Sequence, residues 1–317
     1  MILRVARAAL VGTALLALAC GSRHIGPPPD APSAARPLDA MPGDLDVVVR
    51  LDLHRIRDTL GTTAMTAISE QAVHGLRGAD QATDALLLSA LAGTDTLWLG
   101  LRPTRSLEAA DSVFIMSGSF PHFDPHTARS TPRFGAPVEL GGNLKRYDRE
   151  HSSARSAPAR IYVHGEDLVI SLSEAEIDSV ERSFEEQRGA PGLEPAEKGV
   201  LSLIARPRAL PDVLFAGSDT LRRLAARAER LELNADLSGA GVDATLSLRF
   251  GDASSAEHVA QALNELRDAL KGGTGRLSKL AARLQITNAA EYATVKLSAS
   301  RDELADLVNC RGSDCAW

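Results

Sequence analysis

The same order of hydrophobic patterns occurs twice along this chain. In the first half, apolar residues at every second position from Leu45 to Leu53 predict a half-buried strand. Two helical stretches follow, then a strand pair, a hairpin and a closing helix. We expect these elements near residues 54–73, 80–92, 97–101, 113–116, 160–163, 168–172 and 173–187.

The second half repeats this order with clearer strands. After a strand at 200–205 and a helical stretch at 211–228, two strictly alternating strands at 231–237 and 242–250 flank the turn sequence of residues 238–241. Ser254 and Glu257 are spaced as a capping box for a long helix that Gly272 ends. A short helix at 277–284, a hairpin of 285–287 with 293–299 and a last helix complete the pattern.

Both halves end on a Ser-x-x-Glu motif that follows an alternating strand. In Ser173/Glu176 and in Ser300/Glu303, the hydroxyl and the carboxylate are spaced to bond the free amides of a first helical turn. We therefore expect an α+β fold of two related lobes, each an antiparallel sheet covered by helices, produced by an ancient duplication. Hairpin–helix units also recur in unrelated α+β proteins, so independent origin stays open.

The domain boundaries follow from composition. The lobes are expected over residues 41–190 and 197–309, with the Pro- and Gly-bearing segment 188–199 as their junction and a cysteine-containing tail at 310–317. Residues 131–159 are rich in Pro, Gly and Ser and are expected to form a long loop, the kind of segment on which binding functions are often carried.

The N-terminus has the three parts of an export signal. Arg4 and Arg7 supply positive charge, an apolar run follows, and Ala19 precedes Cys20 at a small-residue cleavage site. The apolar run is shorter than the roughly 20 residues that a membrane span needs. We expect residues 1–19 to be a signal peptide and the Pro- and Ala-rich stretch through residue 40 to be an extended tether.

The sequence "LLALAC" that ends at Cys20 resembles the lipobox of bacterial lipoproteins. This resemblance implies that Cys20 carries fatty-acyl chains such as palmitate and anchors the protein to a membrane. Because residue 21 is Gly rather than Asp, it also implies the outer membrane, by analogy with enterobacterial lipoproteins. The stretch "MPGDLDVVVRLDLHRIR" from Met41, together with the late Ser-x-x-Glu helix, resembles uncharacterised envelope lipoproteins of myxobacterial type, which implies an address but no chemistry.

Charge and cysteine content agree with an exported protein. The formal net charge is −6, and removal of the signal peptide takes away two arginines and no acid, so nucleic acid is not an expected partner. With Cys20 assigned to the lipid, Cys310 and Cys315 remain as an even pair in an oxidising compartment, and we expect a disulfide between them.

Candidate chemistry is sparse. His122, Asp124 and His126 have metal-ligand spacing, but Asp124 before Pro125 is also typical of a helix start, and we favour that interpretation over a zinc site. The glutamates Glu174, Glu176, Glu181, Glu185 and Glu186 are expected on an exposed helix face. No nucleophile elbow, Ser-x-x-Lys motif or phosphate-binding loop occurs.

These observations favour a non-catalytic envelope lipoprotein that needs no cofactor and acts by binding or scaffolding an unknown envelope protein or ligand. Two alternatives stay open. One is an envelope hydrolase or metal-dependent enzyme whose site is assembled from residues distant in sequence. The other is a small-ligand carrier with a cavity between the lobes.

Overall fold

The computed structural model describes residues 37–61, 89–103, 111–128, 133–150, 158–186, 195–210, 219–238, 241–273 and 276–300, together with residues 86, 193 and 303. They belong to two compact units, divided along the chain between Glu194 and Pro195. The units consist of antiparallel strands with helices, which confirms the α+β class. None of the helices within these residues has the length and apolar character required to cross a membrane.

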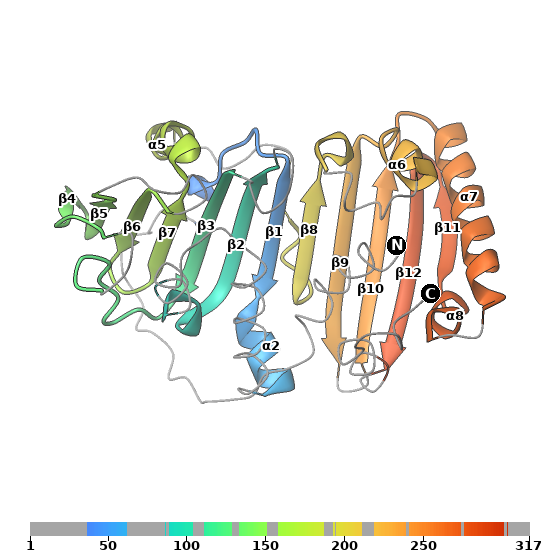
Figure 1. Cartoon of the computed structure of the whole chain (residues 1–317), viewed down its shortest axis with the longest axis horizontal. Helices are drawn as coiled ribbons and strands as arrows, with labels where there is room; N and C mark the ends of the chain where they lie inside the picture. The colour runs from blue at the N-terminus through green and yellow to red at the C-terminus, as the bar shows by residue number, and fades with distance from the viewer. Residues whose placement is uncertain are drawn as a thin grey trace. The chain divides into compact units, whose positions relative to one another are not determined.

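The first unit contains an antiparallel sheet of seven strands (Figure 1). Its strands are β1 (Val47–Asp52), β2 (Thr94–Arg102), β3 (Asp111–Gly118), β4 (Val138–Gly141), β5 (Leu144–Asp148), β6 (Arg160–His164) and β7 (Leu168–Leu172). In space they follow the order β1-β2-β3-β7-β6-β5-β4. All five residues of β7 are buried, in agreement with a sequence that is apolar at every position except Ser171.

The helical elements of this unit are η1 (Pro37–Ala40), α2 (Leu53–Leu60), η3 (Glu174–Glu176) and α5 (Ile177–Glu186). Helix α2 begins where Asp52 accepts a hydrogen bond from the backbone N–H of Arg55. The chain just after η1 is tightly packed, because a Cβ atom on Gly100 would lie 2.4 Å from the Leu45 side chain and 2.6 Å from that of Met41. The expected helices at 54–73 and 80–92 are described only at Leu53–Leu60 and in a few residues near Ala90.

Residues 131–159 are not one long loop, and this expectation was wrong for the middle of the segment. Strands β4 and β5 form a hairpin here, and β5 continues the sheet by pairing with β6. The two-residue turn Gly142–Asn143 has φ angles of 56° and 63°, the left-handed values that a type I′ hairpin turn requires. Phe134 and Tyr147 are buried, so this segment also contributes to the core.

The second unit has a five-stranded antiparallel sheet of β8 (Leu201–Ala205), β9 (Arg230–Ser238), β10 (Gly241–Arg249), β11 (Gln285–Ala289) and β12 (Tyr292–Ser300). Their order in space is β8-β9-β10-β12-β11. The helical elements are η4 (Pro207–Ala209), α6 (Asp219–Ala225), α7 (Ala253–Lys271) and α8 (Arg276–Ala281). The part of the expected 211–228 helix that is described starts at Asp219.

Helix α7 packs on the sheet beside β11 and β12 (Figure 1). Its apolar stripe of Ala256, Val259 and Ala260 is buried against a cluster that includes Leu248 and Phe250. The helix ends at Lys271 before Gly272, as predicted. Its start was predicted wrongly: Asp252, not Ser254, accepts the N-terminal hydrogen bond, from the backbone N–H of Ser255.

The two sheets share one connectivity. In each unit the first three strands lie side by side in chain order. Each unit then closes with a hairpin, β6–β7 or β11–β12, whose second strand pairs with the third strand of the sheet. Strands β1, β2, β3, β6 and β7 of the first unit thus correspond to β8, β9, β10, β11 and β12 of the second. The β4–β5 hairpin has no counterpart among the described residues of the second unit.

Candidate functional site

The sequence cluster of His122, Asp124 and His126 forms a turn. The side chain of Asp124 accepts a hydrogen bond of 2.9 Å from the backbone N–H of His126, and the imidazole Nδ1 of His126 lies 3.0 Å from the carbonyl oxygen of Phe134. Asp124 therefore bonds the backbone as expected, but the residues described after it, 125–128, form a turn and not the expected helix. Within the described ranges, no group of three or more His, Cys, Asp or Glu side chains is arranged to hold a metal ion.

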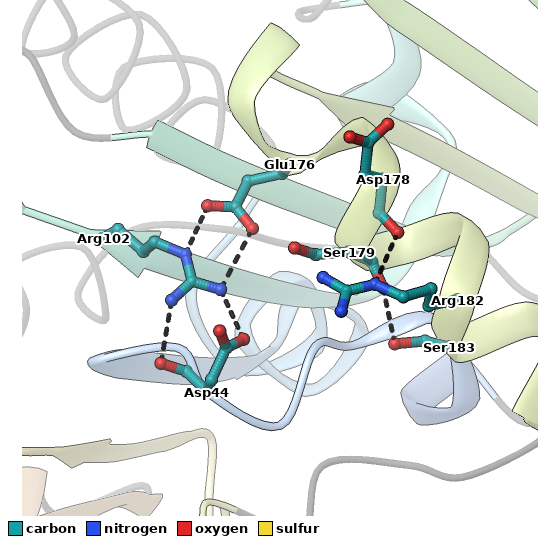
Figure 2. Close-up of polar contacts among 7 residues, drawn as sticks. All are labelled: Asp44, Arg102, Glu176, Asp178, Ser179, Arg182 and Ser183. Atoms are coloured by element: carbon teal, nitrogen blue, oxygen red, sulfur yellow. Dashed lines mark hydrogen bonds and ion pairs between the residues drawn. The ribbon is translucent and has the colours of Figure 1, made fainter.

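One polar cluster of the first unit surrounds Arg102, the last residue of β2 (Figure 2). Its guanidinium Nε donates to the Glu176 carboxylate at 2.6 Å, and its Nη1 donates to the Asp44 carbonyl oxygen at 3.0 Å. A further hydrogen bond joins Nη2 to the Asp44 carboxylate. Arg102 thus connects the chain just after η1, the end of β2 and the start of helix α5.

Burial and charge explain the electrostatics of this cluster. The Glu176 side chain is only 1% exposed, whereas that of Asp44 is 68% exposed. The hydrogen bond from Arg102 lowers the pKa of the Asp44 carboxyl below its usual value. Burial alone would lower the pKa of Arg102, but its hydrogen bonds to the two carboxylates raise it. Both shifts favour the charged forms of Asp44 and Arg102.

A second cluster joins the same helix to strands β5 and β6. Arg160 donates to the carboxylates of Asp148 and Glu181, and the Tyr162 hydroxyl donates to Glu181 at 2.9 Å. Burial of Tyr162 raises the pKa of its phenol to about 12. The pKa shifts of Asp44, Arg102, Arg160 and Tyr162 each favour the form that the group has in water near pH 7, which suits structural support better than proton transfer.

The expectation that the glutamates of η3 and α5 face solvent was wrong for Glu176, which is buried. Glu174 is exposed as expected, with 66% of its side chain accessible, and Glu181 is 41% exposed although it bonds Arg160 and Tyr162. The side chains of Glu185 and Glu186 lie outside the described part of the chain. No local sequence signal identifies these pairs, because Arg102 and Glu176 are 74 residues apart.

The two predicted terminal capping boxes have different outcomes. At Ser300/Glu303 the box is confirmed: the Ser300 N–H donates to the Glu303 carboxylate at 2.9 Å, and the Glu303 N–H donates to the Ser300 hydroxyl at 3.3 Å. At Ser173/Glu176 it is wrong, because the Ser173 hydroxyl accepts from the Ser112 N–H and Glu176 pairs with Arg102. In both units, however, an arginine bonds the glutamate, Arg102 in the first and Arg283 in the second.

The outward-facing surface of the β4–β5 hairpin was not identified from the sequence as a feature of its own. Val138 and Leu140 are 43% and 46% exposed and are the two most exposed large hydrophobic side chains among the described residues. The signal that could have found the hairpin is the turn dipeptide Gly142-Asn143 between two short runs that contain apolar residues. Cys20, Cys310 and Cys315 lie outside the described residues, so lipidation and the disulfide stay predictions.

Comparisons with known proteins give a fold and no family. No family model matches the chain, and no curated protein matches it. Among solved structures, the chain is similar to the Treponema protein TP0453. Crystal forms I and IV of that protein each superpose with a TM-score of 0.50 at 12% sequence identity over 87% of this chain, covering 97% and 98% of the TP0453 chain respectively. At this identity the likeness shows that the two chains share a fold.

Proposed function

We propose that this protein is a non-catalytic lipoprotein of the cell envelope that acts by binding or scaffolding. The observation that carries the proposal is the structural role of the two polar clusters around Arg102 and Arg160. In both clusters an arginine bonds carboxylates and thereby joins η3 and helix α5 to the sheet, so these polar groups stabilise the fold. Catalysis would require a nucleophile or metal with a base and a stabiliser in mutual reach.

The binding role is placed on the β4–β5 hairpin. Val138 and Leu140 present aliphatic surface to solvent at the end of the sheet, and they alternate along β4 with the exposed Glu139. Large aliphatic side chains that are exposed on the outer strand of a sheet are candidates for a recognition surface. The partner is an envelope protein or ligand that buries these two side chains.

The address rests on the N-terminal sequence. Cleavage before Cys20 would leave a lipidated cysteine followed by about twenty residues of Pro- and Ala-rich tether, with the first buried residues at Ala40 and Met41. Such an anchor holds the folded units near a membrane, and Gly21 favours the outer membrane. Mass spectrometry of the mature N-terminus tests this: we expect an acylated Cys20 and loss of membrane partition in Cys20→Ala. An unmodified wild-type N-terminus would contradict it.

The shared strand order supports an origin of the two units by duplication. Five strands correspond one to one, and Ser173-x-x-Glu176 and Ser300-x-x-Glu303 follow corresponding strands. Independent origin would have to produce the same connectivity and the same terminal motif twice. Duplication is therefore the simpler account.

The binding proposal is tested with Val138→Ser/Leu140→Ser. We expect quantitative cross-linking in isolated membranes to lose the hairpin-dependent adduct, with little change in thermal stability because both side chains are exposed. Glu139→Gln, on the same strand, is the matched control and should retain the adduct. A parallel screen on esterase, peptidase, phosphatase and glycosidase substrates, with and without Zn²⁺, addresses catalysis. Turnover that disappears in His122→Ala or His126→Ala would overturn the proposal in favour of a metal enzyme.

A further inference from the structure

The outer strands of the two sheets expose different side chains. All four residues of β4 are exposed, and two of them, Val138 and Leu140, are large aliphatic residues. The exposed residues of β11 are instead polar or small: Gln285, Thr287, Asn288 and Ala289. The aliphatic outer strand therefore belongs to the first unit, the unit to which the expected tether is joined.

The backbone and the charges of the β4–β5 hairpin disfavour two kinds of partner. Strand β4 is short, follows Pro137 and pairs irregularly with β5, features that oppose the addition of a further strand. Its one charged residue, Glu139, lies 3.4 Å from the ammonium group of Lys145, so residues 138–145 carry no net charge. The hairpin therefore offers a partner apolar surface, and neither a strand edge nor a net charge.

The hairpin lies within reach of a membrane that holds Cys20. The described chain begins with η1, which contacts β3 and α5, and the order β3-β7-β6-β5-β4 places β4 four strand spacings, about 19 Å, from β3. Residues 21–36, if extended at about 3.1 Å per residue, span about 50 Å. The tether is long enough for the hairpin to touch the bilayer. Because the anchor makes this contact intramolecular, a small apolar surface is sufficient.

We propose that the β4–β5 hairpin contacts the lipid bilayer in which Cys20 is anchored, with Val138 and Leu140 at the boundary between head groups and acyl chains. This inference rests on the proposed function and identifies membrane lipid as the ligand that buries these two side chains. Backbone groups at the edge of a sheet need water or head groups as hydrogen-bond partners, which keeps the contact out of the hydrocarbon core. Because the hairpin has no net charge, neutral phosphatidylcholine is sufficient for the contact.

Lipid-attached quenchers test the contact in the acylated mature chain, reconstituted in phosphatidylcholine vesicles. In a background with Cys310→Ser and Cys315→Ser, a fluorophore is attached at Leu140→Cys. The matched control carries the same fluorophore at Thr287→Cys, an exposed position on the outer strand of the other sheet. We expect nitroxide lipids to quench the probe at position 140 at least about threefold more strongly than the probe at position 287. Equal quenching at the two positions would overturn the inference.

Val138→Asp, added to the labelled Leu140→Cys chain, separates insertion from proximity. Residue 138 is exposed, so the fold should tolerate the charge, but the charge opposes entry into the interface and should reduce quenching to the level of the control. Quenching that persists would overturn the inference, because the tether or the fluorophore would then account for it. Cross-linking of position 140 to a protein, without quenching, would overturn it and leave the proposed binding role intact. An unmodified Cys20 in mass spectra would overturn it together with the proposed anchor.

Discussion

The two units have the same strand order, but one face of the sheet is apolar in the first unit and polar in the second. Five corresponding positions, one on each shared strand and aligned by the terminal Ser-x-x-Glu motifs, are all apolar in the first unit and all polar in the second. They are Leu51, Leu97, Met116, Val169 and Val163 in the first, against Ser202, Asn234, Thr245, Lys296 and Gln285 in the second. The connectivity of a sheet therefore does not fix the polarity of its faces.

The sharpest test of this difference uses one substitution at equivalent serines. Ser171 in β7 is 1% exposed, whereas Ser298 in β12 is exposed. Ser171→Lys would bury an unpaired charge and should cost on the order of 3–5 kcal/mol of unfolding free energy, or prevent folding. Ser298→Lys should change it by less than about 0.5 kcal/mol. Urea denaturation measures both, and similar losses would mean that the second unit is also covered on this face.

The equivalent glutamates give the next largest contrast. Glu176→Gln removes the buried one of the two carboxylates that bond Arg102 and leaves only the exposed Asp44, and we expect a loss of about 2–3 kcal/mol after allowing for the partial exposure of the arginine. Glu303→Gln should cost no more than about 0.5 kcal/mol, because glutamine also serves at this capping position. Denaturant titration compares them, with Glu257→Gln as an additional surface control. A larger loss for Glu303→Gln would reverse the structural roles assigned to the two motifs.

Of the two units, only the second is followed in the sequence by a pair of cysteines, Cys310 and Cys315. If Cys310 and Cys315 form the expected disulfide, replacing both by Ser should remove about 2 kcal/mol, the low end of the usual range, because the closed loop is short. Non-reducing mass analysis of the purified mature protein should find no free thiol at either position. Two free thiols would refute the pairing.

The smallest predicted effect concerns alkaline pH and only the first unit. Burial in the folded state raises the pKa of the Tyr162 phenol to about 12, whereas its pKa in the unfolded chain is near 10. The neutral phenol therefore contributes its full stabilisation of the fold below about pH 10, and this contribution is lost as the pH rises toward 12. Tyr162→Phe should flatten the fall in stability over this interval and remove the last phase of tyrosinate absorbance. An unchanged titration would mean that the phenol is accessible to solvent.

Much of the fold could be predicted from periodicity. The alternating strands β9, β10 and β12 and the helix that ends before Gly272 are present as expected, because each pattern reflects one face that must be buried. The β4–β5 hairpin was missed because its strands are short and its content of Gly and Pro is typical of loops. Its turn dipeptide, Gly142-Asn143, was the informative signal.

The polar clusters could not be predicted, because their partners are brought together only by the sheet. Ser173-x-x-Glu176 satisfies the spacing rule for a capping box as well as Ser300-x-x-Glu303 does. The rule fails at the first site because Arg102, from a strand 74 residues earlier, competes for the carboxylate, and the Ser112 N–H competes for the hydroxyl. Local spacing indicates which bonds are possible, and tertiary neighbours decide which of them form.

The packing of Met41 and Leu45 against Gly100 has a mechanical consequence. If the chain is anchored through Cys20, tension on the tether acts on these packed side chains before it acts on the hydrogen bonds of β1. Asp44, fastened by Arg102 to the end of β2 and to Glu176, then spreads the load over two further elements. Pulling on residue 20 should therefore meet its first resistance at residues 37–45, where η1 contacts α5 and β3 and where Met41 and Leu45 pack, and Arg102→Ala should lower that first rupture force.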